Sequence, residues 1–308
     1  MKAIPAGVAP PPPGHASAAR RLRGIVLMSL AVLCFAALDA MAKLLTRHYP
    51  VAAVVWARYA VHMLLLLVMF GPRLRGRLLQ TARPGAQTLR ALLLLATTLL
   101  FVSGLGYIPL AEATAINYLT PLIVTGLSVP LLGERVGRPQ WLAMLAGFIG
   151  VLVIVRPGGA LMTPAVLLPF SAAICNSLYQ IVTRKLSSTE TPVVTNFITG
   201  LVGTLVMSVT LPWSWHTPTL PHALLMVGAG VAGLCGHYLL TRAFECTTPA
   251  VVAPFSYGQI LWAVLLGFAV FGTLPDAASF AGIGIIAASG LYLARRHRAQ
   301  ARSEARPR

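Results

Sequence analysis

The chain has 308 residues, of which 57% are hydrophobic and only 10% are charged. Soluble proteins carry about 25% charged residues, so this composition excludes an ordinary soluble domain and indicates a membrane protein. The formal net charge of +17 would suit a nucleic-acid binder, but the basic residues lie in short clusters between apolar segments. No polar domain exists to carry a basic face, and we therefore expect no nucleic-acid partner.

The chain begins with a polar segment followed by a long apolar one. Residues 1–23 contain the run APPPPG and are predicted to be a disordered tail. The next segment is longer than the hydrophobic part of a signal peptide, contains Asp39 and Lys43, and lacks a clear small-residue cleavage site. We therefore predict an uncleaved first helix that begins near Gly24.

Apolar segments of similar length recur along almost the whole chain. About 20 residues cross the hydrocarbon core, because a helix rises about 1.5 Å per residue and the core is about 30 Å thick. Proline, glycine and clustered charges divide the chain into ten predicted transmembrane helices. These begin near Gly24, Val51, Leu89, Glu112, Pro139, Pro164, Pro192, His222, Thr248 and Ala277.

The basic residues predict the orientation of these helices. Most of the 24 Lys and Arg residues lie near the two ends of the chain and in alternate loops, whereas the other loops hold only Arg47 and Arg156. By the positive-inside rule both termini are cytoplasmic, which requires an even number of helices and agrees with ten. We expect a multi-pass protein of a bacterial inner (plasma) membrane.

The two halves of the chain resemble each other. The segment LCFAALDAMAK aligns with ICNSLYQIVTR, and AINYLTPLIVTGLSVPLLGE aligns with APFSYGQILWAVLLGFAVFGT, which pairs Tyr118 with Tyr257. Each half holds five predicted helices, so the second half enters the membrane from the opposite side. Inverted repeats are typical of secondary transporters, although duplication in an inert protein would also produce them. The predicted organisation is a disordered cytoplasmic tail over 1–23, a first repeat over 24–157, a second repeat over 158–296 and a basic cytoplasmic tail over 297–308.

Charged residues within the predicted helices are candidates for substrate binding or gating. Charges in hydrocarbon cost a few kcal/mol each, so those retained are usually paired or functional. Asp39 and Lys43 share one face of the first helix, and Arg58 and His62 share one face of the second. With Glu112 they predict a cluster in the outer half of the membrane. Two interpretations remain open: an ion pair of Asp39 with Arg58 or Lys43, and a gate or substrate clamp.

Polar faces on four further helices complete the candidate site. The fourth and ninth helices carry matching polar residues beside a proline, and proline frees a backbone carbonyl that is tolerated at membrane depth when it lines a wet cavity. Hydrogen bonding between helices is the alternative explanation. The residues are Asn117, Tyr118 and Thr120 on the fourth helix, Ser256, Tyr257 and Gln259 on the ninth, Asn176, Tyr179 and Gln180 on the sixth, and His237 on the eighth.

The fifth and tenth helices contain the small-residue segments AGFIG and AGIGIIAASG. Small residues allow close helix packing, either within one bundle or between subunits, so a homodimer through these helices is one option. The four cysteines show no metal-ligand spacing, and we expect no disulfide, metal or cofactor.

The segments NYLTPLIVTGLSVPLLGERV and APFSYGQILWAVLLGFAVFGTLPDAASFAGIGIIAASG resemble the drug/metabolite transporter superfamily, specifically its EamA-type members. FAALDAMAKLL and VVWARYAVHMLLLL are most similar to the branch that includes S-adenosylmethionine carriers. The resemblance covers about Gly24 to Arg296 and implies an all-α polytopic membrane protein of ten transmembrane helices in two inverted five-helix EamA-like repeats. It also implies alternating access around a central cavity lined mainly by helices 1, 3, 4, 6, 8 and 9. The sequence departs from the pattern at Thr273, where the second repeat commonly has Glu.

These observations favour a secondary transporter for a small polar or zwitterionic metabolite, such as an amino acid, an amine or a nucleoside-like compound of the S-adenosylmethionine kind. If transport is proton-coupled, Asp39, Glu112 or His62 would carry the proton. A membrane-embedded enzyme acting on a lipid or small molecule is the main alternative, but the sequence lacks HExxH, GxSxG and a suitably paired cysteine. A subunit that serves only assembly is a third hypothesis. We therefore expect no enzymatic activity and a small-molecule partner.

Overall fold

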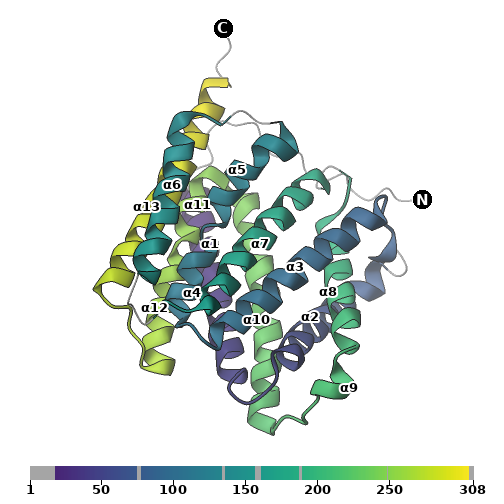
Figure 1. The fold of residues 1–308 in the computed structure, drawn as a ribbon. Coiled ribbons are helices and arrows are strands. Elements are labelled where there is room, and N and C mark those ends of the chain that lie inside the picture. The colour runs from purple at the N-terminus through teal and green to yellow at the C-terminus, as the bar shows by residue number, and fades with distance from the viewer. Residues whose placement is uncertain are drawn as a thin grey trace, which may run out of the picture.

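The computed structural model describes residues 18–74, 78–133, 136–156, 161–186, 189–247 and 249–304, and within these residues every regular element is a helix (Figure 1). The first half contains α1 (Ala18–Leu45), α2 (Val51–Leu74), α3 (Pro84–Leu105), α4 (Leu110–Asn117), α5 (Thr120–Leu132) and α6 (Arg138–Val155). The second half contains η2 (Pro164–Val166), α7 (Leu167–Leu186), α8 (Pro192–Ser208), α9 (Leu211–Ser214), α10 (Leu220–Cys246), α11 (Pro249–Ser256), α12 (Gly258–Phe271) and α13 (Ala277–Glu304).

Ten of these segments are membrane crossings. In the described part of the chain, nine are long and apolar enough to span a bilayer, and Val193–Ser208 is a tenth, shorter apolar helix. The predicted ten-helix, two-repeat architecture of a multi-pass membrane protein is therefore confirmed. Because the number of crossings is even, α1 begins and α13 ends on the same side, which we call the terminal face. The other side is the opposite face.

The fourth and ninth crossings are both interrupted at equivalent points. α4 gives way to α5 around Tyr118, and α11 gives way to α12 at Tyr257. α5 and α12 then end at Gly133 and Gly272, whose φ angles of 68° and 67° lie in the left-handed region. A glycine adopts this conformation without steric cost, which makes it a common helix terminator. The two repeats thus share both overall order and local backbone detail.

The two halves pack extensively against each other. α1 lies against α10, α11 and α12, while α3 lies against α7 and α8, and α2 against α8 and α10. α6 and α13 form a separate pair at one edge of the bundle (Figure 1). Residues that project between α1, α2, α3 and their second-half neighbours consequently lie at the interface between the repeats, where polar groups can be held away from lipid.

The α6–α13 pair explains the small-residue segments of the fifth and tenth helices. A Cβ atom added at Gly282 would lie 2.5 Å from the backbone oxygen of Gly150, and one added at Gly150 would lie 2.9 Å from that of Gly282. The backbones therefore approach closely at this point, as expected for small residues in membrane helices. Close packing within the bundle is thus observed, and a homodimer through the same helices stays a prediction.

The ends of the chain differ from the sequence-based expectation. α1 begins at Ala18 and α13 runs to Glu304, so parts of both predicted tails are helical. Residues 18–23 are Ala, Arg and Leu, which are strong helix formers that extend the apolar helix into the polar region. The predicted disorder of residues 1–17 and the final residues 305–308 lies outside the described residues.

Candidate functional site

A hydrogen-bond network joins the broken helices of the two repeats. The Tyr118 hydroxyl donates to the backbone oxygen of Ser256 at 2.6 Å and lies 3.1 Å from Gln259 Oε1. Gln259 Nε2 donates to Asp39 Oδ2 at 3.0 Å, and the rings of Tyr118 and Tyr257 are 5.0 Å apart. The network therefore connects α1 and the α4–α5 break to α11 and α12. A movement of one repeat against the other would have to rearrange it.

The ion pair considered for Asp39 is not formed in this structure. Asp39 is only 7% exposed, and neither Arg58 nor Lys43 lies within 4 Å of its carboxylate. Lys43 instead donates to the backbone oxygens of Leu105 and Ile108, the second at 2.7 Å. Carbonyls at the end of a helix such as α3 lack partners within the helix and attract a cation. Lys43 therefore fastens α1 to the end of α3.

Glu112 is the second buried carboxylate of the predicted cluster. It lies in the first turn of α4, where the helix dipole favours negative charge, and it is only 3% exposed. Its Oε2 atom has no hydrogen-bond partner among the described residues. Glu112 interacts electrostatically with Lys43, and Asp39 interacts in the same way with Arg58. The predicted cluster is thus two pairs of interacting charges without direct contact.

Arg58, His62 and His237 meet at a small polar cavity of about 30 Å³ between the repeats. The rings of His62 on α2 and His237 on α10 lie 6.0 Å apart, at nearly right angles. Asn196 and Thr199 of α8 also line the cavity. This volume holds about two water molecules, which is much less space than a metabolite needs. The structure brings together three predicted site residues from the two halves of the chain.

Arg90 is a buried cation that the sequence analysis missed. It is 3% exposed, and it donates to the side-chain oxygens of Thr183, Thr199 and Tyr179, each at 2.7 Å. Its guanidinium also lies 4.6 Å from the centre of the Tyr179 ring. A third helix beginning near Leu89, as predicted from the sequence, would place Arg90 at its very end, next to the preceding basic loop. The helix begins at Pro84, and proline at the first helical position was the signal that would have placed Arg90 inside it.

The remaining polar residues divide between the site and the surface. Asn176 Nδ2 lies 3.4 Å from Thr120 Oγ1, and Ser177 Oγ lies 3.2 Å from Thr120 O, so α7 contacts the α4–α5 break. Asn117 Oδ1 is buried with no hydrogen-bond partner in the part of the chain that the structure describes. Gln180 is exposed one turn beyond Asn176 on the same face of α7, and its predicted role in substrate binding or gating stays a prediction.

Two carboxylates outside the membrane crossings tie loops of the two repeats together. On the terminal face, Glu190 accepts hydrogen bonds from the Thr81 hydroxyl at 2.6 Å and the Ala82 amide at 2.9 Å. These bonds hold the pKa of Glu190 below its usual value. On the opposite face, Asp276 forms a bidentate pair with Arg156 at 2.6 and 3.2 Å, and the hydrogen bonds from Arg156 lower the pKa of Asp276 to about 2. We call these contacts the terminal clasp and the opposite clasp.

Comparison with known proteins agrees with this architecture. A riboflavin transporter of Vibrio cholerae is 28% identical over 277 residues, which cover 88% of this chain and 93% of that protein. An S-adenosylmethionine uptake transporter of Rickettsia conorii is 26% identical over 275 residues, with 88% and 92% covered. A solved crystal structure matches with a TM-score of 0.61 at 21% identity, over 89% of this chain and 98% of that one, which supports the fold alone.

The model of the EamA-like transporter family matches this chain twice, at residues 22–156 and 163–295. The two matches correspond to the two five-helix halves seen in the structure. The resemblance that the sequence segments indicated is therefore confirmed over nearly the whole described chain. This protein belongs to the EamA-like transporter family.

Proposed function

We propose that this protein is a secondary transporter that moves a small polar or zwitterionic metabolite across the bacterial inner membrane by alternating access, with both termini cytoplasmic. The observation that carries the proposal is the polar interface between the two repeats. Asp39, Gln259 and Tyr118 bridge the halves on one side of α1, and Arg58 and His237 face the small cavity nearby. Residues 24–157 and 158–296 would act as the two units that move against each other.

The chemistry of the interface supports a substrate with both charge signs and a planar ring. Asp39 offers a carboxylate and Arg58 a guanidinium, so the site can neutralise an ammonium group and an acidic group. The aromatic rings of His62, His237 and Tyr118 offer stacking surfaces. Riboflavin and S-adenosylmethionine, after which two relatives are named, both contain a heteroaromatic ring and a polar chain. A nucleoside-like zwitterion fits this set of groups best.

The small volume of the cavity supports the assignment of this structure to a closed state of such a cycle. A cavity of about 30 Å³ cannot hold a nucleoside-like compound, so helices must separate before substrate enters. The terminal clasp and the opposite clasp both link a first-repeat segment to a second-repeat segment, at the two faces of the bundle. Opening one face while the other stays fastened would give access to one side at a time.

Flux measurements in proteoliposomes test the proposal. Purified protein is reconstituted and offered a pool of isotope-labelled metabolites that includes S-adenosylmethionine, riboflavin, amino acids and amines. We expect selective uptake or efflux that falls at least tenfold in Asp39→Asn and His237→Ala, because each removes a group at the repeat interface. Gln80→Ala is the control, since Gln80 is exposed in the loop between α2 and α3 and should leave flux unchanged. Absence of flux for every compound would contradict the proposal.

Proton coupling is tested with the same vesicles. Glu112 Oε2 has no hydrogen-bond partner in the described part of the chain, and Asp39 accepts its hydrogen bond from a neutral amide. Either carboxyl group could therefore gain and lose a proton without breaking an ion pair. We expect the variant that removes the proton carrier, Asp39→Asn, Glu112→Gln or His62→Gln, to lose the dependence of its remaining flux on a pH gradient. Substrate binding should persist in Glu112→Gln, because Glu112 is not among the groups assigned to the substrate. Retention of that dependence in all three variants would rule out proton transfer through these residues.

A further inference from the structure

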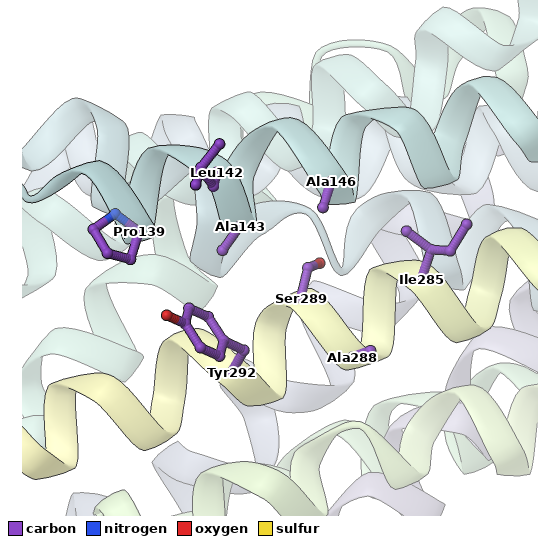
Figure 2. A pocket seen from close by; sticks show the side chains of 8 residues that line it. All are labelled: Pro139, Leu142, Ala143, Ala146, Ile285, Ala288, Ser289 and Tyr292. Carbon is purple, nitrogen blue, oxygen red and sulfur yellow. The ribbon is translucent and has the colours of Figure 1, made fainter.

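An apolar groove of about 430 Å³ lies between α6 and α13, away from the interface of the repeats. Pro139, Leu142 and Ala146 of α6 and Ile285, Ala288 and Tyr292 of α13 line it (Figure 2). Leu142 is 65% exposed and Tyr292 is 44% exposed, and the two helices form an edge of the bundle. In a membrane protein, a groove at this position opens toward lipid.

The groove has the depth of one leaflet. It starts at Pro139 in the first turn of α6 and reaches Ala146, about 10 Å further along the helix axis. On α13 it extends from Tyr292 back to Ile285, which lies about 15 Å from Arg295 at the end of the membrane crossing. Half of the hydrocarbon core is also about 15 Å thick. An acyl chain that enters from the terminal face would therefore fit along the groove.

Two cations lie at the end of the groove nearest the terminal face. Arg138 immediately precedes Pro139, and Arg295 follows Tyr292 by one helical turn. Both side chains are exposed, and neither forms an ion pair with any residue that the structure describes. The Tyr292 hydroxyl is directed toward the Pro139 end (Figure 2). An apolar channel capped by two cations and a hydroxyl matches the layout of an anionic phospholipid.

We propose that this groove binds one acyl chain of an anionic phospholipid, whose phosphate is held by Arg138 and Arg295. A second copy of the protein is a poorer occupant. In a two-fold dimer with its axis along the membrane normal, the same face meets itself, so Arg138 and Arg295 of both copies would lie together and repel one another. An anionic headgroup neutralises the two arginines, and its acyl chain fills the groove. One lipid molecule therefore accounts for both features.

Native mass spectrometry of the purified full chain in neutral detergent tests the proposal, whether or not the protein transports the expected metabolites. The probes are phosphatidylglycerol and phosphatidylcholine with identical acyl chains. We expect wild-type protein to retain phosphatidylglycerol at concentrations on the order of tenfold lower than phosphatidylcholine, given two basic contacts. The double variant Arg138→Gln/Arg295→Gln should lose this preference. Arg21→Gln/Arg23→Gln removes two exposed cations of α1 from the same face and should keep it.

A second pair of variants tests the apolar part of the groove. Ala288→Trp should fill the groove and reduce retention of both lipids, whereas Ala281→Trp places the same side chain on an exposed position of α13 outside it. Equal retention of the two lipids by the wild type would overturn the proposal. So would an equal loss of phosphatidylglycerol in both double-arginine variants. A dimer that Ala288→Trp dissociates and Ala281→Trp does not would assign the face to a second copy of the chain instead.

Discussion

At the residue scale, the burial of Arg90 is the feature that sequence reasoning handled least well. A guanidinium among lipid-facing helices would usually be matched by a carboxylate, but its side-chain partners here are the oxygens of two threonines and a tyrosine. These acceptors come from α7 and α8, so Arg90 joins the third crossing to the second repeat. A threonine or tyrosine is compatible with almost any helix face, and its partner cannot be identified before the fold is known.

We expect Arg90→Ala to destabilise the protein by about 2–4 kcal/mol, because it leaves several buried hydroxyls without a donor. The measurement is the thermal unfolding midpoint in detergent, with Arg21→Ala as the control at an exposed arginine. If Arg90→Ala abolished flux with an unchanged unfolding midpoint, Arg90 would belong to the substrate site and its role as an anchor would be wrong.

At the element scale, the lengths of the apolar segments and the positions of the charged residues were sufficient to count the crossings. Prolines marked where several of the helices begin. The starts predicted at Val51, Pro192 and Ala277 agree with the structure. The start predicted near Leu89 is wrong, because a charge cluster was taken as the end of a loop although α3 begins at Pro84. Charge marks a helix boundary only when the side chain reaches water, and Arg90 reaches hydroxyls of neighbouring helices instead.

The α6–α13 contact gives a prediction at the same scale. Gly282→Val should destabilise the protein by about 1–3 kcal/mol, because its Cβ would meet the Gly150 carbonyl and force the helices apart. Gly284→Val is the matched control, since a Cβ added there would meet no atom of a neighbouring helix within 4 Å among the described residues. Any intrinsic helix penalty of valine is common to both variants. Equal unfolding midpoints for the two would show that the close approach does not contribute to stability.

At the scale of the whole molecule, the polar groups of distant helices could be assigned to one site in outline only. The sequence predicted that polar residues of the first, second, fourth, sixth, eighth and ninth helices contribute to one site, and the structure places several of them at the repeat interface. The Asp39 contact with Gln259 and the clasps could not be predicted, since they depend on how two repeats dock. Inverted symmetry indicates which helices correspond and leaves open which side chains meet.

The two clasps predict opposite effects on the conformational equilibrium. Glu190→Gln should favour opening of the terminal face, and Asp276→Asn should favour opening of the opposite face, each by about fivefold at most because water screens exposed pairs. The measurement is the labelling rate of single cysteines introduced at the two faces. Identical changes in both variants would show that the clasps do not act on separate faces.

The pH dependence of the opposite clasp follows from the lowered pKa of Asp276. With a pKa of about 2 in the folded protein and about 4 when unpaired, the clasp is fully formed above about pH 4 and is lost as the pH falls toward 2. Because the thiolate fraction of any cysteine rises with pH, the labelling rate at the opposite face is compared with that of a reference cysteine in an exposed loop. We expect this ratio to be constant between about pH 5 and pH 8. A rise within that range that persists in Asp276→Asn would have to come from another group.

The central claim is that the protein carries a metabolite between two alternately open states. Solute counterflow tests it most directly: proteoliposomes are loaded with an excess of unlabelled substrate and diluted into a trace of the labelled compound. The account predicts a transient accumulation of label above its equilibrium level, which is lost in Asp39→Asn and kept in Gln80→Ala. Equilibration without an overshoot, or chemical conversion of the labelled compound, would contradict it.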